Sequence, residues 1–95
     1  GLWIFPQRIE VALNRHPMVL ESAVIGEKQH GLLRPAAFVI LKKAVDDPLQ
    51  VTAELKEYCK VVCSKHEYPH SIYFVDDLPK TASGKLQRFQ LERGV

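Results

Sequence analysis

The stretch Ala36-Ala37-Phe38-Val39-Ile40-Leu41 decides the fold of this 95-residue chain. It is a nearly continuous apolar run, which is typical of a central strand that is covered on both faces of a sheet. Residues 19–25 form another largely apolar run and predict a second strand, and residues 26–31 form a polar turn between the two. Because this connection is short, we expect the two strands to pair antiparallel.

A helix is predicted before this pair of strands. Pro6 suits the first turn of a helix, where a missing backbone N–H costs nothing. Ile9, Ala12 and Leu13 follow at helical spacing, and the helix is expected to end at the residue before Pro17.

A second helix is predicted after the strands. Asp47 is its candidate N-cap, and Pro48 would occupy the first helical position. Its buried stripe is expected to comprise Leu55, Cys59 and Val62, and its exposed face Lys56, Glu57 and Lys60. Residues 72–75 then predict a third strand, and the chain is expected to close with a loop and a short helix.

The predicted order is therefore helix, strand, strand, helix, strand, helix. A three-stranded sheet with helices packed on it buries the most apolar surface for this pattern, so the predicted class is α+β. A length of 95 residues indicates one small domain, residues 1–95. Because the sequence opens within an apolar segment and without an initiator methionine, we expect it to be part of a longer chain.

Composition excludes several classes of protein. A net charge of +2 with dispersed basic residues does not favour nucleic-acid binding, and no apolar run approaches the length of a membrane span. Cys59 and Cys63 lack further ligands at suitable spacing, so no metal site is predicted, and the two are expected to be reduced thiols. Reduced thiols suggest a cytoplasmic protein.

The most distinctive segment near the C-terminus is Leu78-Pro79-Lys80-Thr81-Ala82-Ser83-Gly84-Lys85-Leu86-Gln87-Arg88. Ser83 is a candidate N-cap for a helix that continues to Leu91, which would place Lys85 on the first helical turn. Gly84 would act as a hinge, so that the lysine ammonium can reach a phosphate or carboxylate. The alternative is an ordinary solvated loop lysine.

No nucleophile–base pair is visible, so a self-contained active site is not expected. Glu10 and Glu21 are candidates for a carboxylate pair, although the sequence does not fix their separation. Cations interleaved with Tyr68 could hold a nucleotide, with phosphates on the cations and the base against the ring. These cations are Lys60, His70, Lys80, Lys85 and Arg88. A solvated basic face is the alternative interpretation.

Residues 75–88, Val75-Asp76-Asp77-Leu78-Pro79-Lys80-Thr81-Ala82-Ser83-Gly84-Lys85-Leu86-Gln87-Arg88, closely resemble the C-terminal signature of adenylate-forming enzymes. These enzymes are acyl- and aryl-CoA synthetases, nonribosomal adenylation domains and luciferases. Residues 13–26 resemble the helix-to-strand passage of the family, and residues 37–41 its next strand. Residues 1–10 resemble the end of the segment after the hinge between the two domains of the family. The resemblance thus covers the whole chain.

The resemblance implies a two-step reaction. A carboxylate attacks the α-phosphate of ATP to give an acyl-adenylate and pyrophosphate, and a thiol, usually that of CoA, then displaces AMP. Lys85 matches the adenylation lysine of the family, on a C-terminal domain that swings between the two steps. Mg²⁺ is expected in the full-length enzyme and not on this domain, and the implied partner is the N-terminal adenylation domain of the same chain.

The resemblance also implies a CoA site. Gly1 and Leu2 match the loop that lines the pantetheine tunnel. The positions that match contacts to the CoA nucleotide are Lys60, Tyr68, Pro69 and His70. His70 stands where an arginine is common and Glu67 where a lysine is common, which weakens the expected grip on phosphate.

The expected function is that of the C-terminal domain of an acyl- or aryl-CoA ligase, most like benzoate or medium-chain ligases. Two alternatives remain from the sequence. One is a freestanding domain that binds a nucleotide or a partner in trans, and the other is the same domain in a nonribosomal adenylation module. The sequence does not name the carboxylic acid.

Overall fold

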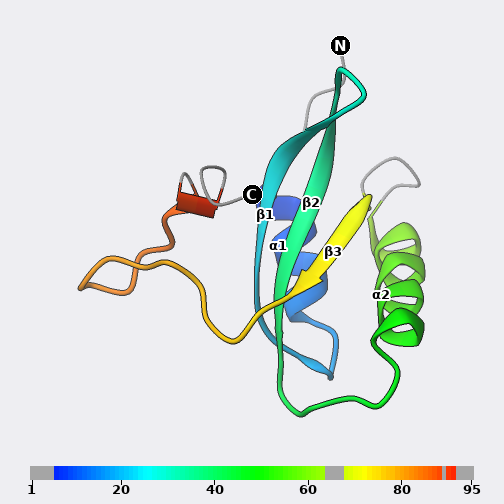
Figure 1. The fold of residues 1–95 in the computed structure, drawn as a ribbon. Helices are drawn as coiled ribbons and strands as arrows, with labels where there is room; N and C mark the ends of the chain where they lie inside the picture. The colour runs from blue at the N-terminus through cyan, green and yellow to red at the C-terminus, as the bar shows by residue number, and fades with distance from the viewer. Residues whose placement is uncertain (1–5, 64–67, 89, 92–95) are drawn as a thin grey trace.

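The computed structural model describes residues 6–63, 68–88 and 90–91. Its regular elements, in chain order, are α1 (Pro6–Asn14), β1 (Val19–Gln29), β2 (Leu32–Leu41), α2 (Pro48–Val62) and β3 (Ser71–Phe74) (Figure 1). Within these described residues the strands form one sheet in the order β1-β2-β3, so the predicted α+β fold and the central place of β2 are confirmed. No helix of the described part is long and apolar enough to cross a membrane.

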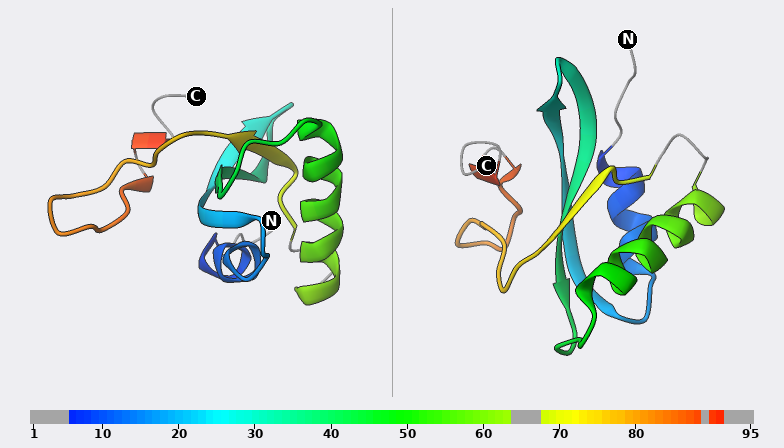
Figure 2. Two further views of the ribbon diagram at one scale, coloured as in Figure 1. Left: turned by 90° about the horizontal axis from the view of Figure 1, so that it is seen from below. Right: turned by 45° about the vertical axis from the view of Figure 1, so that its right-hand side comes forward.

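The sheet combines two kinds of strand pairing. β1 and β2 pair antiparallel, as predicted, from Val19 opposite Leu41 to Gln29 opposite Leu32. β2 and β3 pair parallel, with Ala36 opposite Ser71. A parallel pair needs a crossover connection, which α2 supplies on one face of the sheet (Figure 2).

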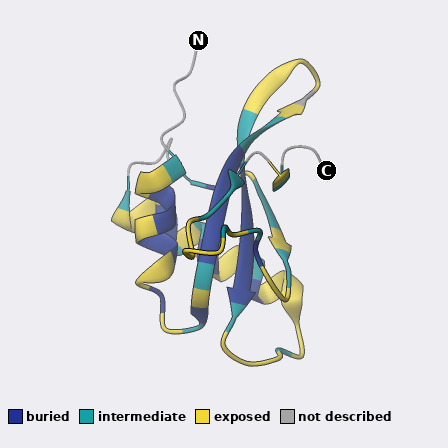
Figure 3. Cartoon of the chain, turned by 90° about the vertical axis from the view of Figure 1, so that its left-hand side faces the viewer, coloured by how far each residue is buried: buried dark blue, intermediate teal, exposed yellow. Residues whose placement is uncertain are grey.

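The predicted turn at residues 26–31 is wrong. The strands continue through it, and only His30 and Gly31 form the turn, with φ of 53° and 79°. Positive φ at both central residues is the geometry of a tight hairpin turn that matches the twist of the strands. The tip of this hairpin is exposed (Figure 3). Among the described residues there, neither face of the strands is buried, so successive polar residues can still pair as strands.

One face of the sheet carries the larger core, where α1 and α2 pack (Figure 2). The Asp47 carboxylate accepts a hydrogen bond from the Gln50 N–H at 3.2 Å, so the predicted cap of α2 is confirmed. Val62 was predicted to be buried and is 43% exposed, because the last turn of α2 lies at the rim of the core beside an open hollow. The buried stripe instead comprises Val51, Leu55 and Cys59.

The other face of the sheet is covered by the C-terminal segment. Ala36, Phe38 and Ile40 of β2 point to this face, whereas Ala37 and Val39 point to the helices. Leu78 is only 4% exposed there, and Val75, Leu86 and Leu91 pack around it. The strand β3 begins one residue earlier than predicted, and Val75 still donates its N–H to the Val39 carbonyl at 3.0 Å.

Candidate functional site

The segment that follows Leu78 forms a hairpin rather than the start of a helix. Lys80 and Leu86 are antiparallel bridge partners, and the Thr81 N–H donates to the Lys85 carbonyl at 2.9 Å. The Gln87 N–H donates to the Pro79 carbonyl at 2.9 Å and closes the base. We call residues 80–86 the lysine hairpin.

The prediction that Ser83 caps a helix with Lys85 in its first turn is therefore wrong. Gly84 has a φ of 89°, which is left-handed and incompatible with the start of a helix at this point. The described residues of the hairpin are not helical, and helical geometry begins only at Arg88. Phe89, which was expected within that helix, lies outside the described residues.

Hydroxyl groups fix the tip of the lysine hairpin. The Thr81 hydroxyl lies 3.0 Å from the Ser83 hydroxyl and accepts the Lys85 N–H at 3.0 Å. The Gly84 N–H donates to the Thr81 carbonyl at 2.9 Å. These bonds hold the backbone of Lys85 in one geometry while its side chain remains free to extend.

Of the three cations in this segment, Lys85 is the one whose ammonium has no ion pair within the described residues. Lys80 Nζ lies 2.7 Å from Glu21 Oε1, and Arg88 pairs with Glu10. Lys85 is exposed. Lys80 and Leu86, at the base of the hairpin, contact the body of the domain instead.

Glu10 is the most buried charged group next to this segment, with 8% of its surface exposed. Its Oε2 accepts the Val24 N–H at 2.7 Å and Arg88 Nε at 2.8 Å, and its Oε1 accepts Arg88 Nη2. Glu10 and Glu21, the candidate carboxylate pair, thus bind one cation each. All four charged residues were noted in the sequence, but nothing in it indicated that Lys80 pairs with Glu21 and Arg88 with Glu10.

A second cationic surface lies at the C-terminal end of α2 and the start of β3. Lys60 Nζ lies 4.7 Å from the centre of the Tyr68 ring and 3.5 Å from Glu57 Oε1. Tyr68 packs against the core beneath the helices. Pro69 is fully buried, so its side chain supports the loop from inside. Gly1, Leu2 and Glu67 lie outside the described residues.

The backbone position of His70 and the charged residues near its imidazole place it on the same surface. Its N–H donates to the Pro35 carbonyl at 2.8 Å, which fixes the residue at the edge of β2. His70 is exposed, and slight desolvation together with the positive charges of Arg34 and Lys56 lowers the pKa of its imidazole. Arg34 lies on β2, far from His70 in the chain, so no local signal in the sequence connects it with this surface.

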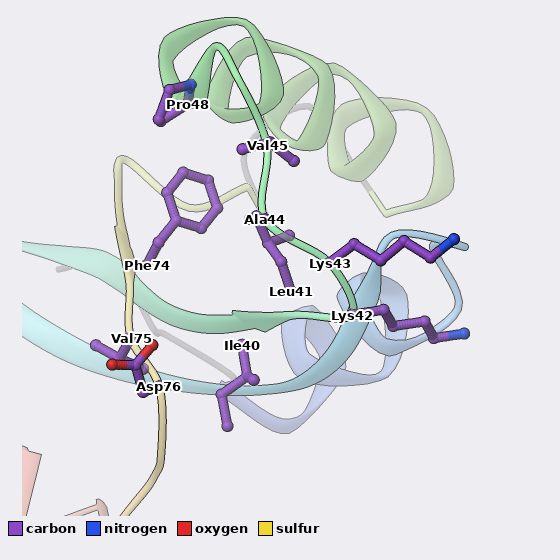
Figure 4. Close-up of a pocket in the computed structure, with 10 residues that line it drawn as sticks. All are labelled: Ile40, Leu41, Lys42, Lys43, Ala44, Val45, Pro48, Phe74, Val75 and Asp76. Carbon is purple, nitrogen blue, oxygen red and sulfur yellow. The ribbon is translucent and has the colours of Figure 1, made fainter.

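Among the predicted site residues that the structure describes, Lys60, His70 and Lys85 are exposed, Tyr68 is partly buried and Pro69 is buried. One hollow near the ends of β2 and β3 contains none of them, and the side chains of Lys42 and Lys43 point away from it (Figure 4). Cys59 and Cys63 form no disulfide and are both reduced thiols, as predicted. Burial, and to a lesser degree the nearby Cys63, raises the pKa of the Cys59 thiol to about 12.

The chain is similar to known CoA ligases along almost its whole length. The chain is 48% identical over 93 residues to a 4-hydroxybenzoate–CoA/benzoate–CoA ligase of Rhodopseudomonas palustris, covering 96% of this chain and 17% of that protein. It is 44% identical over 92 residues to the human mitochondrial acyl-coenzyme A synthetase ACSM5, covering 93% of this chain and 16% of that protein.

Its fold matches a crystal structure of the anthranilate CoA ligase AuaEII in complex with anthranoyl-AMP, with a TM-score of 0.90 and 38% identity. That match covers 99% of this chain and 18% of the ligase, so the chain spans about one sixth of the length of such proteins. The family model of the AMP-binding enzyme C-terminal domain matches residues 8–85. The chain therefore belongs to the family of AMP-binding enzyme C-terminal domains.

Proposed function

We propose that the chain serves an acyl- or aryl-CoA ligase by supplying the adenylation lysine, Lys85, and part of the surface that binds CoA. The reaction joins a carboxylic acid to CoA, with ATP converted to AMP and pyrophosphate. The proposal rests on one observation, which is the environment of the Lys85 side chain compared with that of the two neighbouring cations. Lys85 is exposed on a hairpin whose backbone is fixed, while the two neighbouring cations are held in ion pairs.

The chemistry of the first step gives such a lysine a clear role. Negative charge builds on the α-phosphate as the carboxylate attacks it, and a delivered ammonium stabilises both groups. An ammonium already paired with a carboxylate of its own domain would lend less charge. Among Lys80, Lys85 and Arg88, only Lys85 meets this requirement within the described residues.

For the second step we propose the surface around Lys60, Tyr68 and His70. Lys60 lies over the Tyr68 ring, and Lys56 and Arg34 lie near enough to His70 to lower its pKa. A phosphate of the CoA nucleotide would relieve this concentration of positive charge, and the aromatic ring offers a face to the base. Gly1 and Leu2 are proposed to line the tunnel that holds the pantetheine arm of CoA, on the resemblance alone.

The two surfaces belong to opposite sides of the sheet. Leu86 of the lysine hairpin packs on the face away from the helices, and Tyr68 packs against the core beneath them. One domain that presents these sides to a single active centre must turn between the two steps. The proposed partner is therefore the N-terminal domain of a longer chain, which would also bind the acid and any Mg²⁺ that accompanies ATP.

The test separates the two half-reactions in the complete ligase. Lys85→Ala is expected to slow adenylation by about 10³-fold, measured as pyrophosphate exchange, because a charge aimed at the transition state is lost. Thioester formation from supplied acyl-adenylate should be retained. Lys43→Ala, an exposed lysine outside both surfaces, is the matched control. Equal loss of both half-reactions in Lys85→Ala would reject the proposed role.

The CoA surface has its own test. Lys60→Ala is expected to raise the KM for CoA and to leave pyrophosphate exchange unchanged, because CoA enters only the second step. His70→Ala should do the same to a smaller extent, since its lowered pKa keeps the imidazole mostly neutral at pH 7. A KM for CoA that neither change affects would reject this surface.

A further inference from the structure

We propose that Glu10 and Arg88 are a positioning pair, which fixes the lysine hairpin to the body of the domain so that Lys85 is delivered at one place. The inference rests on the proposed role of Lys85. It assigns to Glu10 a part in adenylation, although its carboxylate lies on α1 and faces Arg88 rather than any substrate.

The lysine hairpin is not a strand of the sheet. Among the described residues, no backbone hydrogen bond joins it to β1, β2 or β3, and its ladder is internal. Figure 1 shows it standing to the side of β1, away from the helices. Its place must therefore be set by side chains that face the sheet, which are Leu78, Lys80, Leu86 and Arg88.

These four contacts differ in how much they restrict the hairpin. Leu78 and Leu86 hold it by apolar packing, which is not directional. Lys80 makes one contact with Glu21, and both side chains are about one third exposed, at 35% and 33%. Such a pair exchanges readily with water and fixes little.

Arg88 is held much more firmly. Its guanidinium donates from two nitrogens to the two oxygens of Glu10, a geometry that fixes direction as well as distance. The Glu10 side chain is 11% exposed and also accepts the Val24 N–H at 2.7 Å. One carboxylate thus joins α1, β1 and the C-terminal segment two residues after the hairpin closes.

The distance between these contacts and Lys85 is short along the chain. Leu86 closes the bridge with Lys80, and Arg88 follows two residues later, on the arm of the chain that leaves the hairpin. Rotation of this arm about its apolar contacts would move the tip and the ammonium with it. Because a displacement of about 1 Å from a reacting group can lower a rate by about 100-fold, adenylation should be sensitive to this pair.

Two conservative substitutions isolate the positioning role. Glu10→Gln keeps one oxygen that can accept the Val24 N–H. Its other terminal group is an amide NH₂, which cannot accept a hydrogen bond, so the two-pronged contact with the Arg88 guanidinium is lost. Arg88→Lys keeps the charge but loses the two-pronged donor. Both are made in the complete ligase, with Glu54→Gln as the matched control, because Glu54 is a half-exposed carboxylate on α2 that pairs with His16 at 3.7 Å.

Glu10→Gln and Arg88→Lys are expected to lower the kcat of adenylation by about 10- to 100-fold, with the KM for ATP little changed. Thioester formation from supplied acyl-adenylate, which uses the other side of the domain, should stay within about twofold of the unchanged protein. Arg88→Ala should lower adenylation further than Arg88→Lys. Glu54→Gln should change neither half-reaction.

The alternative is a pair that only stabilises the fold, and both half-reactions would then fall together, which overturns the inference. Unchanged adenylation in Glu10→Gln and Arg88→Lys, alongside a strong loss in Lys85→Ala, overturns it while the proposed function stands. Unchanged adenylation in Lys85→Ala overturns both. If Glu10→Gln does not fold, as judged by circular dichroism, Arg88→Lys and Arg88→Ala decide by the same criteria, because they leave the Val24 bond intact.

Discussion

Removal of the Glu10 side chain is expected to destabilise the protein more than any other loss of a single charge in its described part. In Glu10→Ala the Val24 N–H loses its acceptor, and Val24 is completely buried. A buried donor without a partner costs about 1–3 kcal/mol. Arg88 also loses its partner, but its side chain is 29% exposed, so water limits that part to about 1 kcal/mol.

The expected loss in the free energy of unfolding is therefore about 2–4 kcal/mol, measured by urea denaturation followed by circular dichroism. Glu10→Gln should lose only about 1 kcal/mol, because its amide oxygen still accepts the Val24 N–H. Glu54→Ala, which removes a side chain that is 56% exposed, should lose less than about 1 kcal/mol. Equal losses in Glu10→Ala and Glu10→Gln would show that the bond to Val24 contributes nothing.

Four further predictions follow from single features. Leu55→Ala, at a fully buried position, should lower the free energy of unfolding by about 2–5 kcal/mol in the same denaturation assay. Gly84→Ala should slow pyrophosphate exchange, because a φ of 89° strains any side chain at the tip of the lysine hairpin; an unchanged rate would contradict this. His70→Arg should lower the KM for CoA at pH 7.5, where the imidazole with its lowered pKa is mostly neutral and the guanidinium is charged; a raised KM would contradict it. Iodoacetamide should modify Cys63 well before Cys59 in the folded protein, as peptide mass spectrometry would show, because the thiolate of Cys59 forms only near pH 12.

The same thiol predicts how stability depends on pH. The folded state raises the pKa of Cys59 from 9.0 to about 12, so above pH 9 the unfolded chain releases a proton that the folded chain keeps. This contribution to stability is complete below pH 9 and is lost as the pH rises towards 12. Between pH 9 and pH 10 the protein should lose on the order of 1 kcal/mol more than Cys59→Ala does. Parallel curves for the two proteins would contradict the assignment.

The sequence predicted the elements that the core dictates. The apolar run of β2 and the cap at Asp47 are local signals, and both agree with the structure. The hairpin tip was missed because charged residues outside the core carry no pattern that distinguishes a strand from a turn.

The C-terminal segment was missed for a different reason. Ser83 satisfied the local rule for a helix cap, but contacts distant in sequence override it. Lys80 forms an ion pair with Glu21, which lies 59 residues earlier in the chain, and Arg88 with Glu10, which lies 78 residues earlier. Because these partners lie so far away, the sequence singled out Lys85 by its motif but could not show that Lys80 and Arg88 are held in ion pairs.

The central strand explains how one small domain can hold two different surfaces rigidly. Along β2, Val39 points into the core under the helices, while Phe38 and Ile40 point to the face that carries the lysine hairpin. A slip of one residue in its pairing would exchange these sets and misplace both surfaces at once. The proposed turn of the domain between the two steps therefore requires that β2 keep its register, because neither surface can be repositioned without the other.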